Sequence, residues 1–162
     1  MFSYTSLTLL LTALLAACGS DTAQVDAEGT RNPTVIELIQ VLKDGNHFHI
    51  AKGSGAVTVY ETSGYYPVGY LGYLPSGGES GTVRIYSCQA GGTDNFVSRR
   101  SDCEGRAKVK GDFSLYSSGG DNRAALYRCY DTAKSDHLML RSQSCGGAKN
   151  EGLLGFVRTS PY

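Results

Sequence analysis

The sequence predicts an all-β domain made of three related segments, on three observations. The 162 residues include 21 glycines and 11 tyrosines, and no long stretch has apolar residues at the 3.6-residue spacing of a helix. Short apolar runs alternate with turn-forming residues. Gly69, Gly111 and Gly152 hold equivalent places in three similar segments, 42 and 41 residues apart. Such a threefold period predicts a β-trefoil-like fold, with a three-bladed prism as the alternative.

The predicted domain covers residues 34–162, with repeats at about 34–80, 81–122 and 123–162. The second and third repeats begin with an apolar-Tyr-x-Cys strand, pass through a polar turn to Asp-Asn-Phe or Asp-His-Leu, and end with Cys-x-Gly and an apolar strand. In the first repeat, IQVLKDGNHFHI and VGYLGYLPSGG supply the first and last strands. An amphipathic helix in Thr34–Lys43 is the alternative there, but the repeat favours a strand.

The interior of the domain follows from this alignment. Each repeat has room for three or four short strands, so a complete trefoil would hold about twelve. We expect Ile85, Phe96, Leu126 and Phe156 to fill the barrel and its cap, because these apolar residues recur on the predicted strands.

The N-terminus is typical of a bacterial lipoprotein signal peptide. An apolar run from Leu7 to Ala17 ends in Leu-Ala-Ala-Cys, which matches the lipobox. The run is too short to cross a bilayer permanently. We therefore expect residues 1–17 to be removed, and acyl chains such as palmitate on Cys18 to anchor the chain. Gly19 resembles the default outer-membrane sorting signal, so the expected location is the cell envelope, at the outer membrane or the cell surface.

Residues 18–33 are predicted to form a flexible tether behind the lipid. They are rich in Ser, Asp, Thr, Ala and Gly and have almost no large apolar side chain. A flexible chain of this length reaches roughly 20 Å. The tether would lift the domain off the membrane surface.

The four cysteines that remain after Cys18 fall into two pairs of similar spacing. Cys88 and Cys103 are 15 residues apart, and Cys129 and Cys145 are 16 apart, at equivalent places in two repeats. Pairing within each repeat preserves this equivalence, so we predict two intra-repeat disulfides. Each would stabilise the domain by about 3 kcal/mol. A zinc site is the rival interpretation, but the sequence has no Cys-x-x-Cys pair and an oxidising compartment disfavours it.

Four elements of the third repeat match the pattern Leu-Tyr-Arg, Asp-His-Phe, Glu-Gly and Gly-Tyr or Gly-Phe. They are LYRCY, Asp136-His137-Leu138, Glu151-Gly152 and Leu154-Gly155-Phe156-Val157. With these elements the chain resembles a repeat of unknown function in secreted bacterial and fungal proteins. Such repeats often accompany secreted hydrolases as accessory parts, so the resemblance implies binding or scaffolding. The second repeat departs from the pattern, because it has Asn95 for His and lacks Glu-Gly.

No arrangement of residues indicates catalysis. The 15 basic and 15 acidic residues balance, which argues against a nucleic-acid partner. His47 and His49 alternate on one strand, a spacing that metal sites use, but no third ligand is evident, and we interpret them as exposed polar residues. Asp136-His137 lacks a nucleophile on a Gly-x-Ser-x-Gly turn. We therefore predict no catalytic site, no metal and no cofactor.

Ten residues are candidates for binding, because sugar sites combine aromatic rings with hydrogen-bonding side chains. They are Tyr65, Tyr66, Tyr70, Tyr73, Asn46, His47, Asp94, Asn95, Asp136 and His137. The tyrosines could instead form a protein-contact patch. The Asp and Asn residues could instead simply begin turns, which is the preferred interpretation.

The predicted function is a non-catalytic surface lipoprotein that takes part in adhesion, motility or envelope assembly. Its expected partners are a membrane, through the lipid, and proteins of the envelope or cell surface. A carbohydrate-binding trefoil with glycan partners is the alternative. A protease inhibitor is a further alternative, suggested by a trefoil with two disulfides.

Overall fold

The structure, a computed structural model, describes residues 35–52, 64–76 and 78–161. All of them belong to one unit, Pro33–Tyr162. The predicted signal peptide, Cys18 and the tether lie outside the described residues. The described residues form strands and two short 3₁₀ helices, so the domain is all-β, as the sequence predicts. None of their helices is long and apolar enough to cross a membrane.

The described residues form ten strands, which is fewer than the twelve of a complete trefoil. The segment Glu37–Lys43, for which a helix was the alternative, is a strand. In chain order the elements are β1 (Glu37–Lys43), β2 (Asn46–Lys52), β3 (Tyr66–Tyr73), β4 (Thr82–Gly91), β5 (Asp94–Ser98), η1 (Cys103–Gly105), β6 (Ala107–Lys108), β7 (Phe113–Tyr116), β8 (Arg123–Asp131), β9 (Asp136–Leu140), η2 (Cys145–Gly147) and β10 (Lys149–Arg158).

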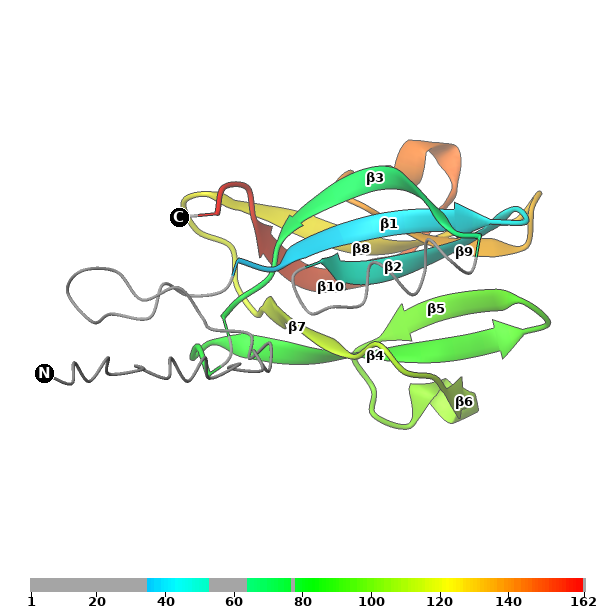
Figure 1. Ribbon diagram of the computed structural model, residues 1–162, viewed down its shortest axis with the longest axis horizontal. Coiled ribbons are helices and arrows are strands. Elements are labelled where there is room, and N and C mark those ends of the chain that lie inside the picture. The colour runs from blue at the N-terminus through cyan, green and yellow to red at the C-terminus, as the bar shows by residue number, and fades with distance from the viewer. Residues whose placement is uncertain (1–34, 53–63, 77, 162) are drawn as a thin grey trace, which may run out of the picture. The chain divides into compact units, whose positions relative to one another are not determined.

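The sheet is built from three antiparallel hairpins, β1–β2, β4–β5 and β8–β9. After each hairpin a strand returns to pair with its first strand: β3 with β1, β7 with β4, and β10 with β8. β10 also pairs with β3 and β7. The result is an open antiparallel sheet in the order β2-β1-β3-β10-β7-β4-β5, with β6, β8 and β9 off this path (Figure 1).

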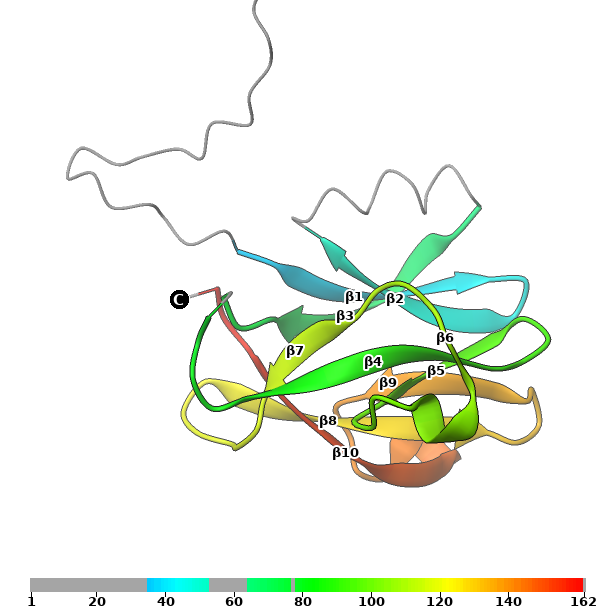
Figure 2. The ribbon, with the colours of Figure 1, turned by 90° about the horizontal axis from the view of Figure 1, so that it is seen from below.

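The second strands of the hairpins meet one another. β2, β5 and β9 are in pairwise contact, and Figure 2 shows β4–β5 lying between β1–β2 and β8–β9 in that view. Residues that begin these strands are far apart in the sequence, but this packing brings them together. It therefore decides where most of the candidate residues lie.

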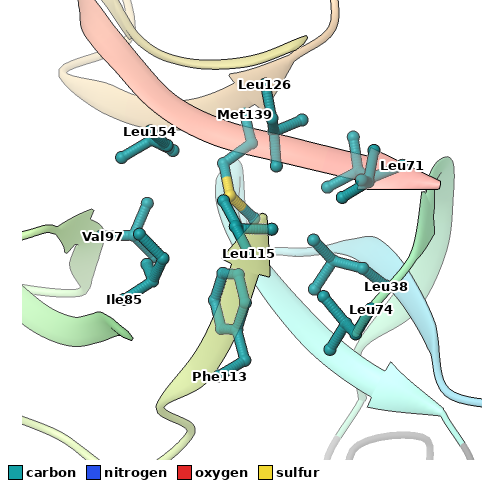
Figure 3. Packing of buried hydrophobic residues seen from close by; sticks show 11 residues of the cluster. Leu38, Leu71, Leu74, Ile85, Val97, Phe113, Leu115, Leu126, Met139 and Leu154 are labelled. Atoms are coloured by element: carbon teal, nitrogen blue, oxygen red, sulfur yellow. The ribbon is translucent and has the colours of Figure 1, made fainter. Parts of the chain in front are cut away.

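The main core consists of apolar side chains from all three hairpins and their return strands (Figure 3). Leu38, Ile85 and Leu126 are fully buried, one from the first strand of each hairpin. Phe96 is also buried, but it packs on the Cys88–Cys103 disulfide in a separate cluster. The expectation for Phe156 is wrong, because it is only partly buried.

The reason for the misplaced Phe156 is the alternation of side chains along β10. A register shift between Leu153 and Gly155 interrupts the pairing with β8. Beyond it Val157 points into the core and is fully buried, so its neighbour Phe156 points the other way. The sequence pattern did not reveal this irregularity.

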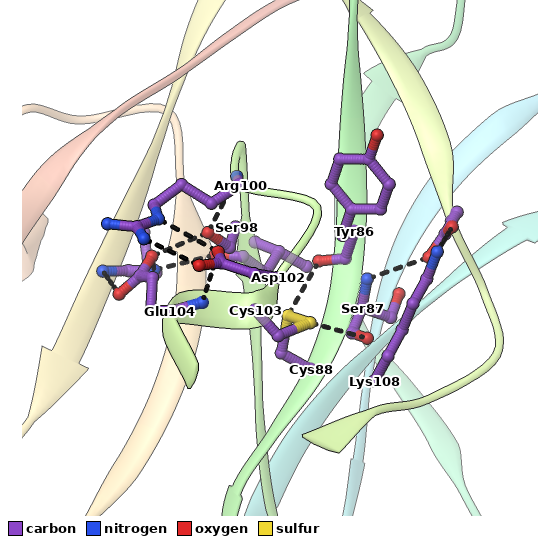
Figure 4. Close-up of a disulfide and its surroundings, with 12 residues drawn as sticks. Tyr86, Ser87, Cys88, Ser98, Arg100, Asp102, Cys103, Glu104 and Lys108 are labelled. Atoms are coloured by element: carbon purple, nitrogen blue, oxygen red, sulfur yellow. Dashed lines mark hydrogen bonds and ion pairs between the residues drawn. A yellow bond between two sulfur atoms is a disulfide. The ribbon is translucent and has the colours of Figure 1, made fainter. Parts of the chain in front are cut away.

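Two disulfides tie the first strand of a hairpin to the 3₁₀ turn that follows it. Cys88 on β4 is joined to Cys103 in η1, and Cys129 on β8 to Cys145 in η2, which are the pairs that the spacing predicts. Around the first of them, Asp102 accepts a hydrogen bond from the backbone N–H of Glu104 at 3.1 Å (Figure 4). All four cysteines are buried.

Candidate functional site

Six of the ten candidate binding residues begin β2, β5 and β9, and we call this set the hairpin junction. It consists of Asn46, His47, Asp94, Asn95, Asp136 and His137. The Oδ1 atom of Asp136 accepts a hydrogen bond from the backbone N–H of His47 at 2.8 Å, and its Oδ2 atom is bonded to His47 Nδ1. Asp136 is fully buried. This carboxylate therefore joins β9 to β2.

The same arrangement occurs a second time. Asp94 Oδ1 accepts from the backbone N–H of His137 at 3.0 Å, and Asp94 Oδ2 lies 2.7 Å from His137 Nδ1. At the third position the amides of Asn46 and Asn95 each donate to a carbonyl of their own turn, at 3.2 and 3.0 Å. The two Asp–His pairs thus hold hairpins together, whereas the two asparagines bond within their own turns.

A second layer of polar contacts also connects each hairpin with the other two. Gln40 Oε1 accepts from the backbone N–H of Met139 at 2.7 Å, and Arg128 Nη1 donates to the Val97 carbonyl at 3.1 Å. His49 Nε2 lies 3.0 Å from Ser87 Oγ.

Sequence reasoning did not single out Gln40 or Ser87 as functional residues. One signal could have found them. Each directly precedes Val41 or Cys88 on its strand, in the position that Arg128 holds before Cys129. A polar residue at this place in all three predicted first strands is unexpected in a core, where it needs a partner.

The cavity next to these contacts is small. It has a volume of about 20 Å³ and is lined by residues of β2, β5 and β9 with Gln40 and Arg128. Such a volume holds about one water molecule. This cavity is therefore too small for a sugar or a cofactor.

His49 is buried, which contradicts the expectation of an exposed histidine. Its Nε2 atom faces Ser87 Oγ and also lies 3.3 Å from the Gly111 carbonyl oxygen. Burial lowers the pKa of His49 to about 4, although the Gly111 carbonyl and the Asp112 carboxylate oppose this shift. Among the described residues, no three His, Cys, Asp or Glu side chains are grouped as metal ligands.

Acidification is expected to destabilise the fold through His49. The folded pKa of about 4 lies below the unfolded value of 6.5, so between these values only the unfolded chain takes up the proton. This part of the stability is fully present above about pH 6.5 and is lost as pH falls toward 4, by up to about 1.4 kcal/mol per pH unit.

Denaturant unfolding at a series of pH values in this window measures the slope. His49→Gln, which cannot be protonated there, should reduce it. An unchanged slope in His49→Gln would show that other groups cause the acid sensitivity.

Arg128 lies in an ion-pair cluster with two carboxylates. Its Nη1 atom donates a hydrogen bond to Glu104 Oε1 at 2.7 Å. Its Nε atom forms an ion pair with Glu151 Oε2 at 3.0 Å, but the geometry is not that of a hydrogen bond. The hydrogen bonds from Arg128 are the main cause that lowers the pKa of Glu104. His137 Nε2 also lies 3.3 Å from Glu151 Oε2. Residues of the Leu-Tyr-Arg, Asp-His and Glu-Gly elements are thus bonded to one another.

The four candidate tyrosines do not form a single cluster. Tyr65 is partly buried and packs near Phe48, with ring centroids 6.2 Å apart. Tyr70 and Tyr73 pack edge to face at 5.4 Å. Tyr66 and Tyr70 are exposed, with 54% and 46% of their surface accessible.

We call the exposed residues Tyr66, Pro67, Val68 and Tyr70 the β3 face. Three of the four exposed large apolar side chains of the described residues lie in it, and the fourth is Leu153. β3 is held by its ladder with β1, and Arg141 Nε donates to the Leu71 carbonyl at 2.8 Å. The pKa of Tyr70 is raised, mainly by partial burial and to a lesser extent by the hydrogen bond with Tyr73.

No family model, no curated protein and no solved structure matches the chain.

Proposed function

We propose that the chain is a non-catalytic interaction module of a bacterial cell envelope, held at the membrane by lipid on Cys18, and that it binds a protein partner through the β3 face. The observation that carries this proposal is the concentration of exposed apolar side chains on β3. Tyrosine is enriched at protein interfaces because it gives a large contact area at a low entropic cost. Contiguous apolar patches on soluble domains commonly mark interaction sites.

The proposed architecture is a β-trefoil-like module of three lobes. Three hairpins with return strands support it, as do polar contacts that join one hairpin to another in a repeated sense. Gly69 and Gly152 lie opposite Gln40 and Arg128 in their ladders, which agrees with the proposed repeat. In this proposal the junction is the scaffold, and the β3 face is the part that differs between lobes.

The proposed anchor rests on the Leu-Ala-Ala-Cys sequence that ends at Cys18. Two or more acyl chains on one residue bind a membrane stably. Labelling of cells with a palmitate analogue should mark the wild-type chain and not Cys18→Ser. Equal labelling of both would reject the anchor.

The β3 face is tested by replacing its two tyrosines together. In intact cells, crosslinking to specific proteins should fall about tenfold or more in Tyr66→Ser/Tyr70→Ser, because buried tyrosines often dominate binding energy. Leu153→Ser is the matched control, since it removes the exposed apolar side chain outside the β3 face. Equal crosslinking by both variants, or no specific crosslink from the wild-type chain at native expression, would contradict the proposal.

Glycan binding is a second candidate, favoured by one observation. The guanidinium of Arg141 lies 5.6 Å from the centroid of the Tyr70 ring, beside Tyr73, so aromatic surface and hydrogen-bond donors occur together. A glycan array decides between the two functions. Binding that is lost in Tyr66→Ser/Tyr70→Ser would favour the glycan, and flat binding by the folded chain would reject it.

A further inference from the structure

An open hollow of about 470 Å³ lies beside β4, against β6 and the segment that leads to β7. Its size falls within the range of small-molecule sites. We call it the β4 hollow; its lining residues are Arg84, Lys108, Val109, Lys110, Gly111 and Asp112.

The β4 hollow carries more positive than negative charge. Arg84, Lys108 and Lys110 line it, and Asp112 is its only acidic lining residue. Lys108 Nζ lies 2.7 Å from Asp112 Oδ2, and Arg84 Nη2 lies 3.8 Å from the same oxygen. Within the described ranges Lys110 has no charged partner and is exposed. The side chains that line the hollow therefore carry a net charge of two positive charges. The net charge of the whole chain is zero.

Two charged groups of the β4 hollow, Asp112 and Lys108, are held in place. Asp112 Oδ1 accepts from the backbone N–H of Ser87 at 3.1 Å, and Lys108 Nζ lies 4.5 Å from the centroid of the Tyr86 ring; Figure 4 shows Tyr86, Ser87 and Lys108 near one another. Burial alone would raise the pKa of Asp112, but the bonds from Lys108 and Ser87 hold it below its usual value. Lys108 would therefore need little reorganisation to meet a ligand.

The corresponding hollow beside β8 is closer to neutral. There Arg128 lies between Glu104 and Glu151, and Arg99 and Arg100 also line the hollow, so three arginines meet two carboxylates. That hollow is also smaller, about 130 Å³. The second repeat has Lys110-Gly111 where the third repeat has Glu151-Gly152, on β10. The surplus of positive charge is thus larger in the β4 hollow, with two charges against one.

We propose that the β4 hollow binds a phosphate group of the monoester type, held by Arg84, Lys108 and Lys110. A phosphate monoester carries about −1.5 to −2 charges at pH 7, which matches the balance of the hollow better than a single carboxylate does. Arginine and lysine bind phosphate oxygens through charge-assisted hydrogen bonds. The site lies outside the β3 face, so it stands whether or not that face binds a protein.

A titration of the full chain with inorganic phosphate at low salt tests the site, followed by ¹H–¹⁵N nuclear magnetic resonance. Lys110→Ala should weaken binding about fivefold, since it removes one charge from an exposed position. Asp112→Asn should tighten binding by about the same factor, because it removes the internal competitor for Lys108. Lys134→Ala, which removes one positive charge from the β8–β9 turn, should leave the affinity within about twofold.

The source of the phosphate is distinguished by two further probes. Glucose 1-phosphate, with glucose as the neutral control, represents a soluble ester. Phosphatidylcholine vesicles with and without phosphatidic acid represent a lipid headgroup. The site is supported if one phosphate probe binds more tightly than its control and Lys110→Ala weakens that binding. The probe that does so identifies the source of the phosphate. No saturable binding of any phosphate probe, or equal losses in Lys110→Ala and Lys134→Ala, would overturn it.

Discussion

Gly72→Ala is expected to lower the free energy of unfolding by about 3 to 5 kcal/mol. A Cβ atom at Gly72 would lie 2.6 Å from Val157 Cγ2 and 2.7 Å from the Arg158 carbonyl oxygen, where β3 meets β10. One of these neighbours is backbone, so the clash cannot be relieved by turning a side chain. The φ angle of +139° is also one that residues with a side chain rarely adopt.

The measurement is denaturant unfolding with both disulfides intact. Gly69→Ala is the matched control on the same strand, because its Cβ would only come within 3.8 Å of Gln40 Cβ, an ordinary contact. It should cost less than about 1 kcal/mol. If Gly72→Ala were as stable as Gly69→Ala, β3 and β10 would not approach as closely as described.

The second large effect is expected for Asp136→Ala, which should lower the free energy of unfolding by about 3 to 5 kcal/mol. The substitution removes both bonds to His47 and leaves the backbone N–H of that residue without its acceptor. A buried donor without a partner keeps its full desolvation cost. Asp136→Asn should be intermediate, because an amide oxygen can still accept from this N–H.

Asp121→Ala is the control, since Asp121 is exposed in a turn, and its effect should stay within about 0.5 kcal/mol. A double-mutant cycle with His47→Ala isolates the energy of the Asp136–His47 pair. If Asp136→Ala kept full stability but lost binding to a ligand, the junction would be a binding site and not a scaffold.

The hairpin junction explains why sequence patterns identified important residues but not what those residues do. Asp136-His137 and Asp94-Asn95 stand out because they recur at strand starts. A recurring Asp before a strand fits an exposed turn as well as a buried cross-link. The choice depends on burial, and burial here depends on three hairpins that meet only in the folded chain.

The tyrosines illustrate the same limit over a shorter distance. Tyr65, Tyr66 and Tyr70 are close in the sequence, but Tyr65 lies before β3, and a register shift of the β1–β3 ladder falls between Tyr66 and Tyr70. An undisturbed strand would alternate regularly. Bulges of this kind depend on how β3 fits between β1 and β10, so local sequence alone does not predict them.

The sequence by itself determined the all-β class, the strand at Glu37–Lys43 and the partners of the four cysteines. These features depend on local composition, on spacing and on the equivalence of two segments. Only the tertiary structure decided that Asp136 bonds to His47 across 89 residues and that Arg84 lines the β4 hollow together with Lys110 and Asp112. The physical reason is that hydrogen-bond partners, burial and local charge balance are set by which strands pack together, and that packing brings together residues whose separation in the chain carries no signal.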